Sequence, residues 1–232
     1  MSNTQQSSGD YRKIVPALIK KGIENINLSM FSEEVKKGLL NAVGEEYFKR
    51  GMMTEATRAY VITQNSQKLI EVGDYHVGIE MYNKGIDAYQ LANSITKLNS
   101  IGEKALKEGR ISEAIRAFKL CSDKDKLNKV GEFCIKTEKI DFALEIYEAI
   151  GNKDKLNEIG DMAFERNQLE LAAKAFQLSA DKPRLNKLGD TFLKEGILSA
   201  AMKCYESSQN DIMVKFIKEN FSDKDREDKL YI

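Results

Sequence analysis

The chain has 232 residues, and its 42% of hydrophobic residues is enough apolar material to bury a sizeable core. Thirty-six basic and thirty-six acidic residues cancel to a formal net charge of zero, so no global field favours nucleic acid or an anionic membrane surface. No uncharged apolar run approaches the ~18 residues of a membrane span, and the polar start MSNTQQSSGD lacks the order of a signal peptide. We therefore expect a cytoplasmic protein with no nucleic-acid partner and no membrane insertion.

Cysteine and histidine are too scarce for a disulfide scaffold or a metal centre. The three cysteines, Cys121, Cys134 and Cys204, are not spaced as in a zinc site, and His76 is the single histidine. We expect reduced thiols, no metal and no cofactor. Only two prolines accompany 31% charged residues, which favours helices over a turn-rich sheet protein. The sequence predicts an all-α fold.

A repeat of 29 residues runs through most of the chain. A leucine is followed by a glycine after four residues, by a small residue after twelve more, and by an aromatic residue after a further four. The leucine and glycine pairs are Leu40 and Gly44, Leu69 and Gly73, Leu98 and Gly102, Leu127 and Gly131, Leu156 and Gly160, and Leu185 and Gly189. The small and aromatic pairs are Ala56 and Tyr60, Gly85 and Tyr89, Ala114 and Phe118, Ala143 and Tyr147, Ala172 and Phe176, and Ala201 and Tyr205. Six uninterrupted copies over residues 36–209 indicate one array of equivalent units.

Each unit is predicted to form two helices. Apolar residues recur with helical periodicity around the leucine and glycine, and a second helix carries the small residue and the aromatic. The turn between them falls seven residues after the glycine, where the chain should adopt the left-handed conformation: Gly51, Glu80, Gly109, Glu138, Asn167 and Gly196. A residue able to cap a helix precedes each next first helix: Asn65, Ser94, Asp123, Asn152, Asp181 and Asn210.

The small residues predict how the helices pack. Glycine on the first helix and alanine on the second should let two antiparallel helices approach closely, while the aromatic fills the gap to the neighbouring hairpin. One hairpin cannot bury both its faces. The units should therefore stack.

The first unit resembles the tetratricopeptide repeat. Leu40, Val43, Gly44, Tyr47, Gly51, Met53, Ala56 and Tyr60 follow that signature at the same relative spacings. The resemblance extends through all six units and implies a right-handed α-solenoid of stacked antiparallel helix hairpins, a TPR-like superhelix. The period of 29 is shorter than the ~34 residues of that family. Short hairpins are also similar to the α-solenoid repeats of vesicle-coat and ciliary-transport subunits.

The two ends depart from the repeat. Residues 210–221 are predicted to form a lone capping helix, with Lys218 at the glycine position, followed by a charged tail over 222–232. Residues 11–35 form a degenerate N-terminal capping repeat, in which Pro16 is incompatible with the interior of a helix that begins at Tyr11. Residues 1–10 are expected to be disordered.

A polar ladder on the first helices is the candidate binding site. An asparagine follows the leucine by one position except at Ile70, and an acid follows four residues later on the same helix face. We call these residues the ladder: Asn41, Glu45, Asp74, Asn99, Glu103, Asn128, Glu132, Asn157, Asp161, Asn186 and Asp190. The resemblance implies that these positions line a concave groove for a peptide, and the acids would favour a basic partner.

The ladder also has a purely structural interpretation. Its asparagines would bond the backbone of the next turn between repeats, and its acids would pair with a basic residue of the next repeat: Lys68, Lys97, Lys126, Lys155 or Arg184. Both interpretations stay open at this point.

An array of equivalent units argues for binding and against catalysis. His76 occupies a slot that other repeats fill with packing residues, and no cysteine has a histidine at matching register. We therefore expect a non-catalytic protein-interaction scaffold that binds a peptide or partner protein, with no catalytic residue. The alternative is a structural α-solenoid subunit of a coat, transport or secretion assembly. The sequence leaves the oligomeric state open.

Overall fold

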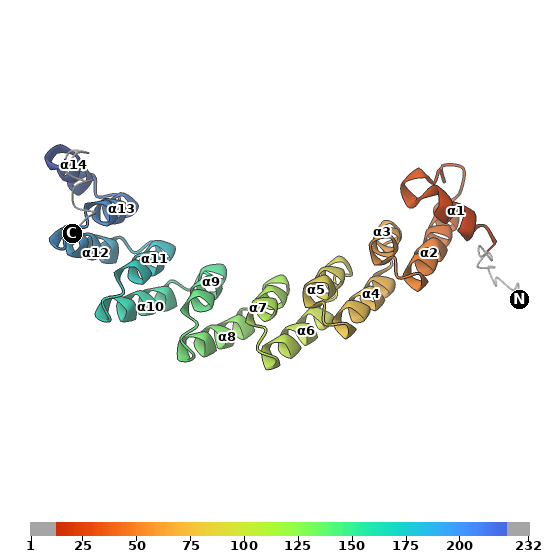
Figure 1. Ribbon diagram of the computed structural model, residues 1–232, viewed down its shortest axis with the longest axis horizontal. Coiled ribbons are helices and arrows are strands. Elements are labelled where there is room, and N and C mark those ends of the chain that lie inside the picture. Colours follow the sequence, from red (N-terminus) through yellow and green to blue (C-terminus); the bar gives the residue numbers. More distant parts are fainter. Residues whose placement is uncertain (1–12, 222–232) are drawn as a thin grey trace, which may run out of the picture. The chain divides into compact units, whose positions relative to one another are not determined.

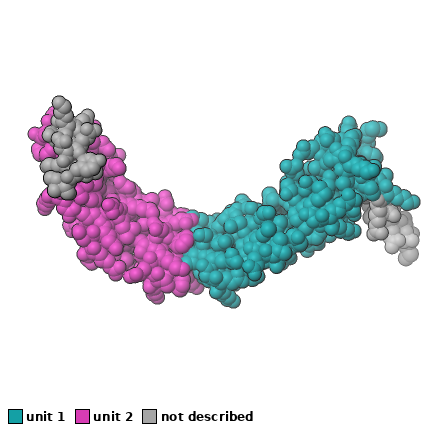
Figure 2. All heavy atoms as spheres, in the orientation of Figure 1, with its two compact units in different colours: residues 1–123 teal, residues 124–232 magenta. Residues whose placement is uncertain are grey.

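The computed structural model describes residues 13–221, so the tails predicted over 1–10 and 222–232 lie outside the described residues. Within residues 13–221 the chain forms fourteen α-helices and one 3-10 helix, with no strand (Figure 1). The predicted all-α fold is confirmed. The chain divides into two compact units, residues 1–123 and 124–232 (Figure 2), which we describe separately.

Unit 1 contains the first three repeats. Its elements are α1 (Val15–Lys21), η2 (Ile23–Asn25), α2 (Glu33–Lys49), α3 (Met53–Thr63), α4 (Ser66–Gly78), α5 (Tyr82–Leu91), α6 (Ile95–Lys107) and α7 (Ile111–Leu120). The helices pack as the pairs α2 with α3, α4 with α5 and α6 with α7. Each second helix also contacts the following first helix, α3 with α4 and α5 with α6, so the hairpins of this unit stack.

Unit 2 contains the other three repeats and repeats this arrangement. Its elements are α8 (Lys124–Lys136), α9 (Ile140–Ile150), α10 (Lys153–Glu165), α11 (Leu169–Ser179), α12 (Lys182–Lys194), α13 (Leu198–Ser208) and α14 (Asp211–Asn220). The pairs are α8 with α9, α10 with α11 and α12 with α13, and the links between pairs are α9 with α10 and α11 with α12. The second helices α9 and α11 also touch each other, as α5 and α7 do in unit 1.

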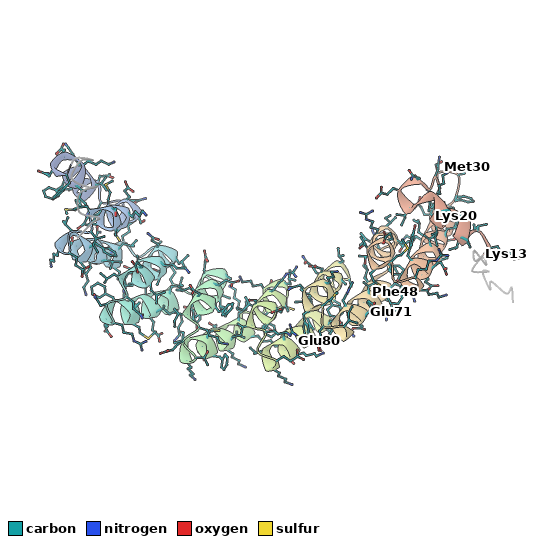
Figure 3. All side chains as sticks on the ribbon, in the orientation of Figure 1. Lys13, Lys20, Met30, Phe48, Glu71 and Glu80 are labelled. Atoms are coloured by element: carbon teal, nitrogen blue, oxygen red, sulfur yellow. The ribbon has the colours of Figure 1, made fainter. Side chains whose placement is uncertain are left out.

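The turn inside each hairpin has the predicted left-handed residue. Gly51 has φ of 74°, and even the glutamates Glu80 and Glu138 have φ of 60° and 59°. Glu80 is labelled in Figure 3, in the turn between α4 and α5. At the first turn the Met52 N–H donates to the Tyr47 carbonyl at 2.9 Å and the Gly51 N–H donates to Phe48 at 3.0 Å. These two bonds make a Schellman motif, which satisfies carbonyls that the helix end leaves free.

A second left-handed residue, which the sequence did not reveal, ends each second helix. It recurs every 29 residues with φ between 52° and 70°: Gln64, Asn93, Ser122, Gly151, Ala180 and Gln209. Gly151 adopts this conformation without steric cost and Asn93 tolerates it, whereas the other four residue types do not favour it. The same Schellman bonds recur here, since the Asn65 N–H donates to the Tyr60 carbonyl at 2.9 Å. The same turn geometry therefore precedes and follows every second helix.

The helix glycines make room for the aromatic ring of their own hairpin. A Cβ atom built on Gly131 would lie 2.7 Å from Cζ of Tyr147, and one on Gly102 would lie 2.6 Å from Cε1 of Phe118. Real side chains do not approach this closely, so no residue with a side chain fits without displacing the ring. All six aromatics are buried, with at most 3% of their surface exposed.

This contact corrects the predicted packing. The aromatic lies against the glycine of its own hairpin and does not merely fill the gap to the next one. The small residue of the second helix is also at the close approach, because a Cβ on Gly85 would lie 3.3 Å from the Gly73 carbonyl oxygen. The five alanines at this position are fully buried: Ala56, Ala114, Ala143, Ala172 and Ala201.

The two end segments complete the cores. Val15 of α1 joins the core that contains Val43 and Tyr47, and Ile217 of α14 joins the core of unit 2. Helix α1 has Pro16 in its first turn, where a proline is tolerated. Helix α2 begins at Glu33, so the boundary predicted at residue 36 lies inside it. The Ser32 hydroxyl accepts a bond from the Val35 N–H, and this cap starts the helix early.

Substituting alanine at two helix glycines should have opposite effects. Gly131→Ala should lower the free energy of unfolding by about 1–3 kcal/mol because the new methyl overpacks against Tyr147. Gly78→Ala in α4 should raise it by up to about 1 kcal/mol, since nothing lies within 4 Å of the new Cβ and alanine favours helix. Urea denaturation of the two variants measures both effects. Changes of the same sign would contradict the packing argument.

Substituting glycine at two alanines of one repeat tests the second left-handed position. Ala180 is exposed and has φ of 57°, so Ala180→Gly should stabilise the chain by about 0.5–1 kcal/mol through relief of backbone strain. Ala173→Gly lies inside α11 and should cost about 1 kcal/mol. Thermal unfolding of the pair distinguishes them, and a loss in both would show that Ala180 is not strained.

Candidate functional site

The ladder lies on the first helices of the six hairpins. Its five asparagines are half-buried, and its acids are exposed except for Asp161, which is half-buried. By helix, its members are Asn41 and Glu45 on α2, Asp74 on α4, Asn99 and Glu103 on α6, Asn128 and Glu132 on α8, Asn157 and Asp161 on α10, and Asn186 and Asp190 on α12.

The asparagines hydrogen-bond to the cap of the next first helix. Asn186 Oδ1 accepts from Ser208 Oγ at 2.9 Å and from Asn210 Nδ2 at 2.8 Å. Asn210 in turn uses its Oδ1 to accept from the Met213 N–H at 3.2 Å, which starts α14. The first asparagine thus holds the amide of the residue that caps the following helix.

The same arrangement recurs in other repeats. Asn41 Oδ1 accepts from Thr63 Oγ1 and from Asn65 Nδ2, both at 2.9 Å. Asn157 Nδ2 donates to Asp181 Oδ2 at 3.1 Å, and Asp181 Oδ1 caps α12. Asn128 Oδ1 lies 3.5 Å from Asn152 Nδ2, which makes a longer bond of the same kind. These observations favour the structural interpretation, with the difference that the partner is the cap side chain and not the turn backbone.

The exception in the ladder coincides with a missing cap. Ile70 stands where the other repeats have asparagine, and the following cap position, Ser94, makes no side-chain cap hydrogen bond. The prediction that Ser94 caps its helix was wrong. Without an asparagine at position 70, nothing from the preceding first helix orients the cap side chain.

Several ladder acids pair with a basic residue of the next repeat, as the structural interpretation expected. Asp74 pairs with Lys97 at 2.7 Å, Asp161 with Arg184 at 2.8 Å, and Glu45 with Lys68 at 3.4 Å. Burial opposes ionisation of Asp74, but hydrogen bonds from Lys97 and Tyr89 and the Lys97 charge outweigh it and lower its pKa. Each exposed ion pair contributes little energy, so these pairs orient successive repeats more than they stabilise the fold.

Two aspartates have a second role that sequence analysis missed. The Tyr89 hydroxyl donates to Asp74 at 2.6 Å, and the Tyr205 hydroxyl donates to Asp190 at 2.7 Å, each joining the two helices of one hairpin. Tyr147, whose repeat has Glu132 at the acid position, has a buried hydroxyl without a partner. Burial, with Glu132 nearby, raises the Tyr147 pKa to about 12. In both repeats the aspartate precedes the tyrosine by 15 residues, and this recurring spacing was the sequence signal that could have predicted the bond.

The described residues offer little that could support chemistry. No group of three or more His, Cys, Asp or Glu side chains in residues 13–221 is placed to hold a metal ion. Cys134 and Cys204 are buried, and burial raises the pKa of the Cys204 thiol to about 11, which opposes reactivity. Among the described helices, none combines the length and apolar character needed to cross a bilayer.

No protein-family model and no curated protein matches this chain. A solved structure that is similar to it is described as "Circular tandem repeat protein with novel repeat topology and enhanced subunit contact surfaces". The sequences are 16% identical, the match covers 93% of this chain and 54% of that one, and the TM-score is 0.23. The chain therefore spans about half the length of that structure, and a likeness at this level does not bear on function.

A double-mutant cycle on Asn186 and Asn210 should measure the link between repeats. Asn186→Ala should cost about 1–2 kcal/mol because it leaves the half-buried Asn210 amide without its acceptor, whereas the Ser208 hydroxyl can still donate to the Tyr205 carbonyl. In the double variant the cost should be smaller than the sum, with a coupling energy of about 0.5–1.5 kcal/mol. Asn220→Ala, at an exposed position of α14, is the control and should change stability by less than about 0.5 kcal/mol. A coupling energy of zero would remove the proposed role of the asparagines.

Proposed function

We propose that the chain is a non-catalytic protein-interaction scaffold that binds a peptide or a partner protein. The equivalence of its six hairpins supports this proposal, because no hairpin concentrates groups that could catalyse a reaction. The tetratricopeptide-like character of the hairpins agrees with it. A cytoplasmic location and the reduced state of the three thiols stay predictions.

An exposed apolar surface in unit 1 is the observation that carries the proposal. Ile62 and Leu91 occupy the same position in the successive second helices α3 and α5, and they are 58% and 51% exposed. Ile95, at the start of α6, is 56% exposed. We call Ile62, Leu91 and Ile95 the unit 1 apolar edge. Scattered exposed apolar residues are ordinary, whereas the recurrence of one at the same position of adjoining hairpins, Ile62 and Leu91, supports a contact surface for a partner.

The ladder now supports a different role from the one expected. Its bonded asparagines hold the next hairpin, so a ligand in a groove there would compete with those bonds. Lys68, Lys97 and Arg184 already neutralise three of the acids, which weakens the case for a basic partner. We therefore propose the unit 1 apolar edge, and not the ladder, as the contact surface.

Capture of the native partner by wild-type and variant chains tests this proposal. The variant Ile62→Ser/Leu91→Ser/Ile95→Ser should retain its helical content and bind the partner at least tenfold less, since buried apolar contacts dominate binding energy. The control Ile197→Ser/Ile212→Ser removes exposed isoleucines from unit 2 and should leave binding unchanged. If both variants bound the native partner equally well, the unit 1 apolar edge would be excluded as the contact surface. Purification only in fixed stoichiometry with large subunits would favour the structural-subunit alternative.

A further inference from the structure

A hollow of about 280 Å³ opens in unit 1 between α3, α4 and α5. Thr57 and Arg58 of α3, Val72 and His76 of α4, and Lys84 and Leu91 of α5 are among the residues that line it. Its volume suits one or two side chains of a partner. Leu91 also belongs to the unit 1 apolar edge, so the hollow continues the surface proposed above.

The hollow lies beside a small residue at a position that is filled by larger apolar residues in the next three repeats. Thr57 occupies a position that the next three repeats fill with Ile86, Ile115 and Leu144, and these are at most 1% exposed. The smaller threonine leaves the space between α3 and α5 unfilled. In agreement, α5 packs against α7 in this unit, whereas α3 and α5 are not among its closely packed pairs.

The charged groups that face the hollow are mostly cationic. Lys84 forms no ion pair with any described residue. Arg58 pairs with Glu24 at 2.6 Å through Nη1, and both side chains are more than half exposed. Asp87 is the acid that lines the hollow, and Arg116 of α7 pairs with it. An anionic group entering the hollow would therefore meet Lys84, which has no ion-pair partner among the described residues, and Arg58, whose charge Glu24 offsets as Arg116 offsets that of Asp87.

His76 adds a buried polar group without a partner. Its side chain is only 8% exposed, and its Nδ1 is buried with no hydrogen-bond partner. Burial and the Lys84 charge lower its pKa, while Asp87 acts in the opposite direction. A buried polar group without a partner is uncommon in proteins, and a ligand is one explanation for it. An entering carboxylate would favour the protonated imidazole.

We propose that this hollow binds the carboxylate of a glutamate or aspartate that is followed by an apolar residue in an acidic partner peptide. Lys84 and Arg58 attract the carboxylate, and the Thr57 hydroxyl and the imidazole of His76 offer polar contacts. Val72 and Leu91 accept the apolar side chain. The inference rests on the proposed interaction function and adds the chemistry of the partner.

The single histidine of the chain provides a direct test. We would follow the imidazole Cε1–H resonance of His76 by NMR while adding acetyl-Gly-Glu-Leu-Gly-amide or its isostere acetyl-Gly-Gln-Leu-Gly-amide to the full chain. The glutamate peptide should shift the resonance and bind about tenfold more tightly than the glutamine peptide, because its contact is charge-assisted. It should also raise the pKa of His76, and added salt should weaken binding.

Two lysine variants locate the site. Lys84→Met should reduce binding of the glutamate peptide by about tenfold, whereas Lys203→Met, at an exposed lysine of α13, should leave it unchanged. Equal binding of the two peptides, no shift with either, or an equal effect of both lysine variants would overturn the inference. If the peptides fail while the variant of the unit 1 apolar edge still loses the native partner, only this inference falls. If that variant also retains the partner, the proposed function falls as well.

Discussion

The contact between an aromatic ring and a glycine backbone is the constraint on which each hairpin depends. In the fifth repeat the Phe176 ring occupies the space that a side chain at Gly160 would need. The backbone carbonyl of Phe176 also accepts a hydrogen bond from the Asp181 N–H, at the cap of the next hairpin. One residue therefore fixes the packing within a repeat and the start of the following one. An inserted residue between ring and cap would break this connection, so the short spacing between Phe176 and Asp181 is fixed.

The helices and their first turns could be predicted because their chemistry is local. The spacing of Leu40, Gly44 and Tyr60 indicates a pair of helices. Gly51 is the residue type that prefers the left-handed conformation of the turn between them. The second turn could not be predicted in this way. Gln64 and Ala180 do not favour a positive φ, and they adopt it because the packed hairpins on either side determine the chain path. The tertiary structure overrides local preference there.

The ladder shows a different limit of prediction. The sequence placed the asparagines and acids on one helix face and allowed a structural role, but it could not show which role they have. The distance of 24 residues between Asn186 and Asn210 becomes a hydrogen bond only when hairpins stack at a particular spacing. The hollow beside His76 was missed for a related reason, since it arises from Thr57, a small residue on a neighbouring helix. The bond and the hollow both depend on how side chains of neighbouring helices fill space together, which the residue type at a single position does not reveal.

The replacement of asparagine by Ile70 has a mechanical consequence. Hydrogen bonds are directional, so an asparagine bonded to the next cap fixes the angle between two hairpins as well as their distance. Ile70 packs against the apolar core, and an apolar contact has no preferred direction. Ser94, its neighbour across the link, supplies no cap bond either. The link between the second and third hairpins therefore depends on bonds at other positions, the Lys97–Asp74 ion pair and the Tyr82–Glu108 hydrogen bond, and on the packing of α5 against α7. Charged side chains take over at this joint the orienting role that a neutral amide has at the others.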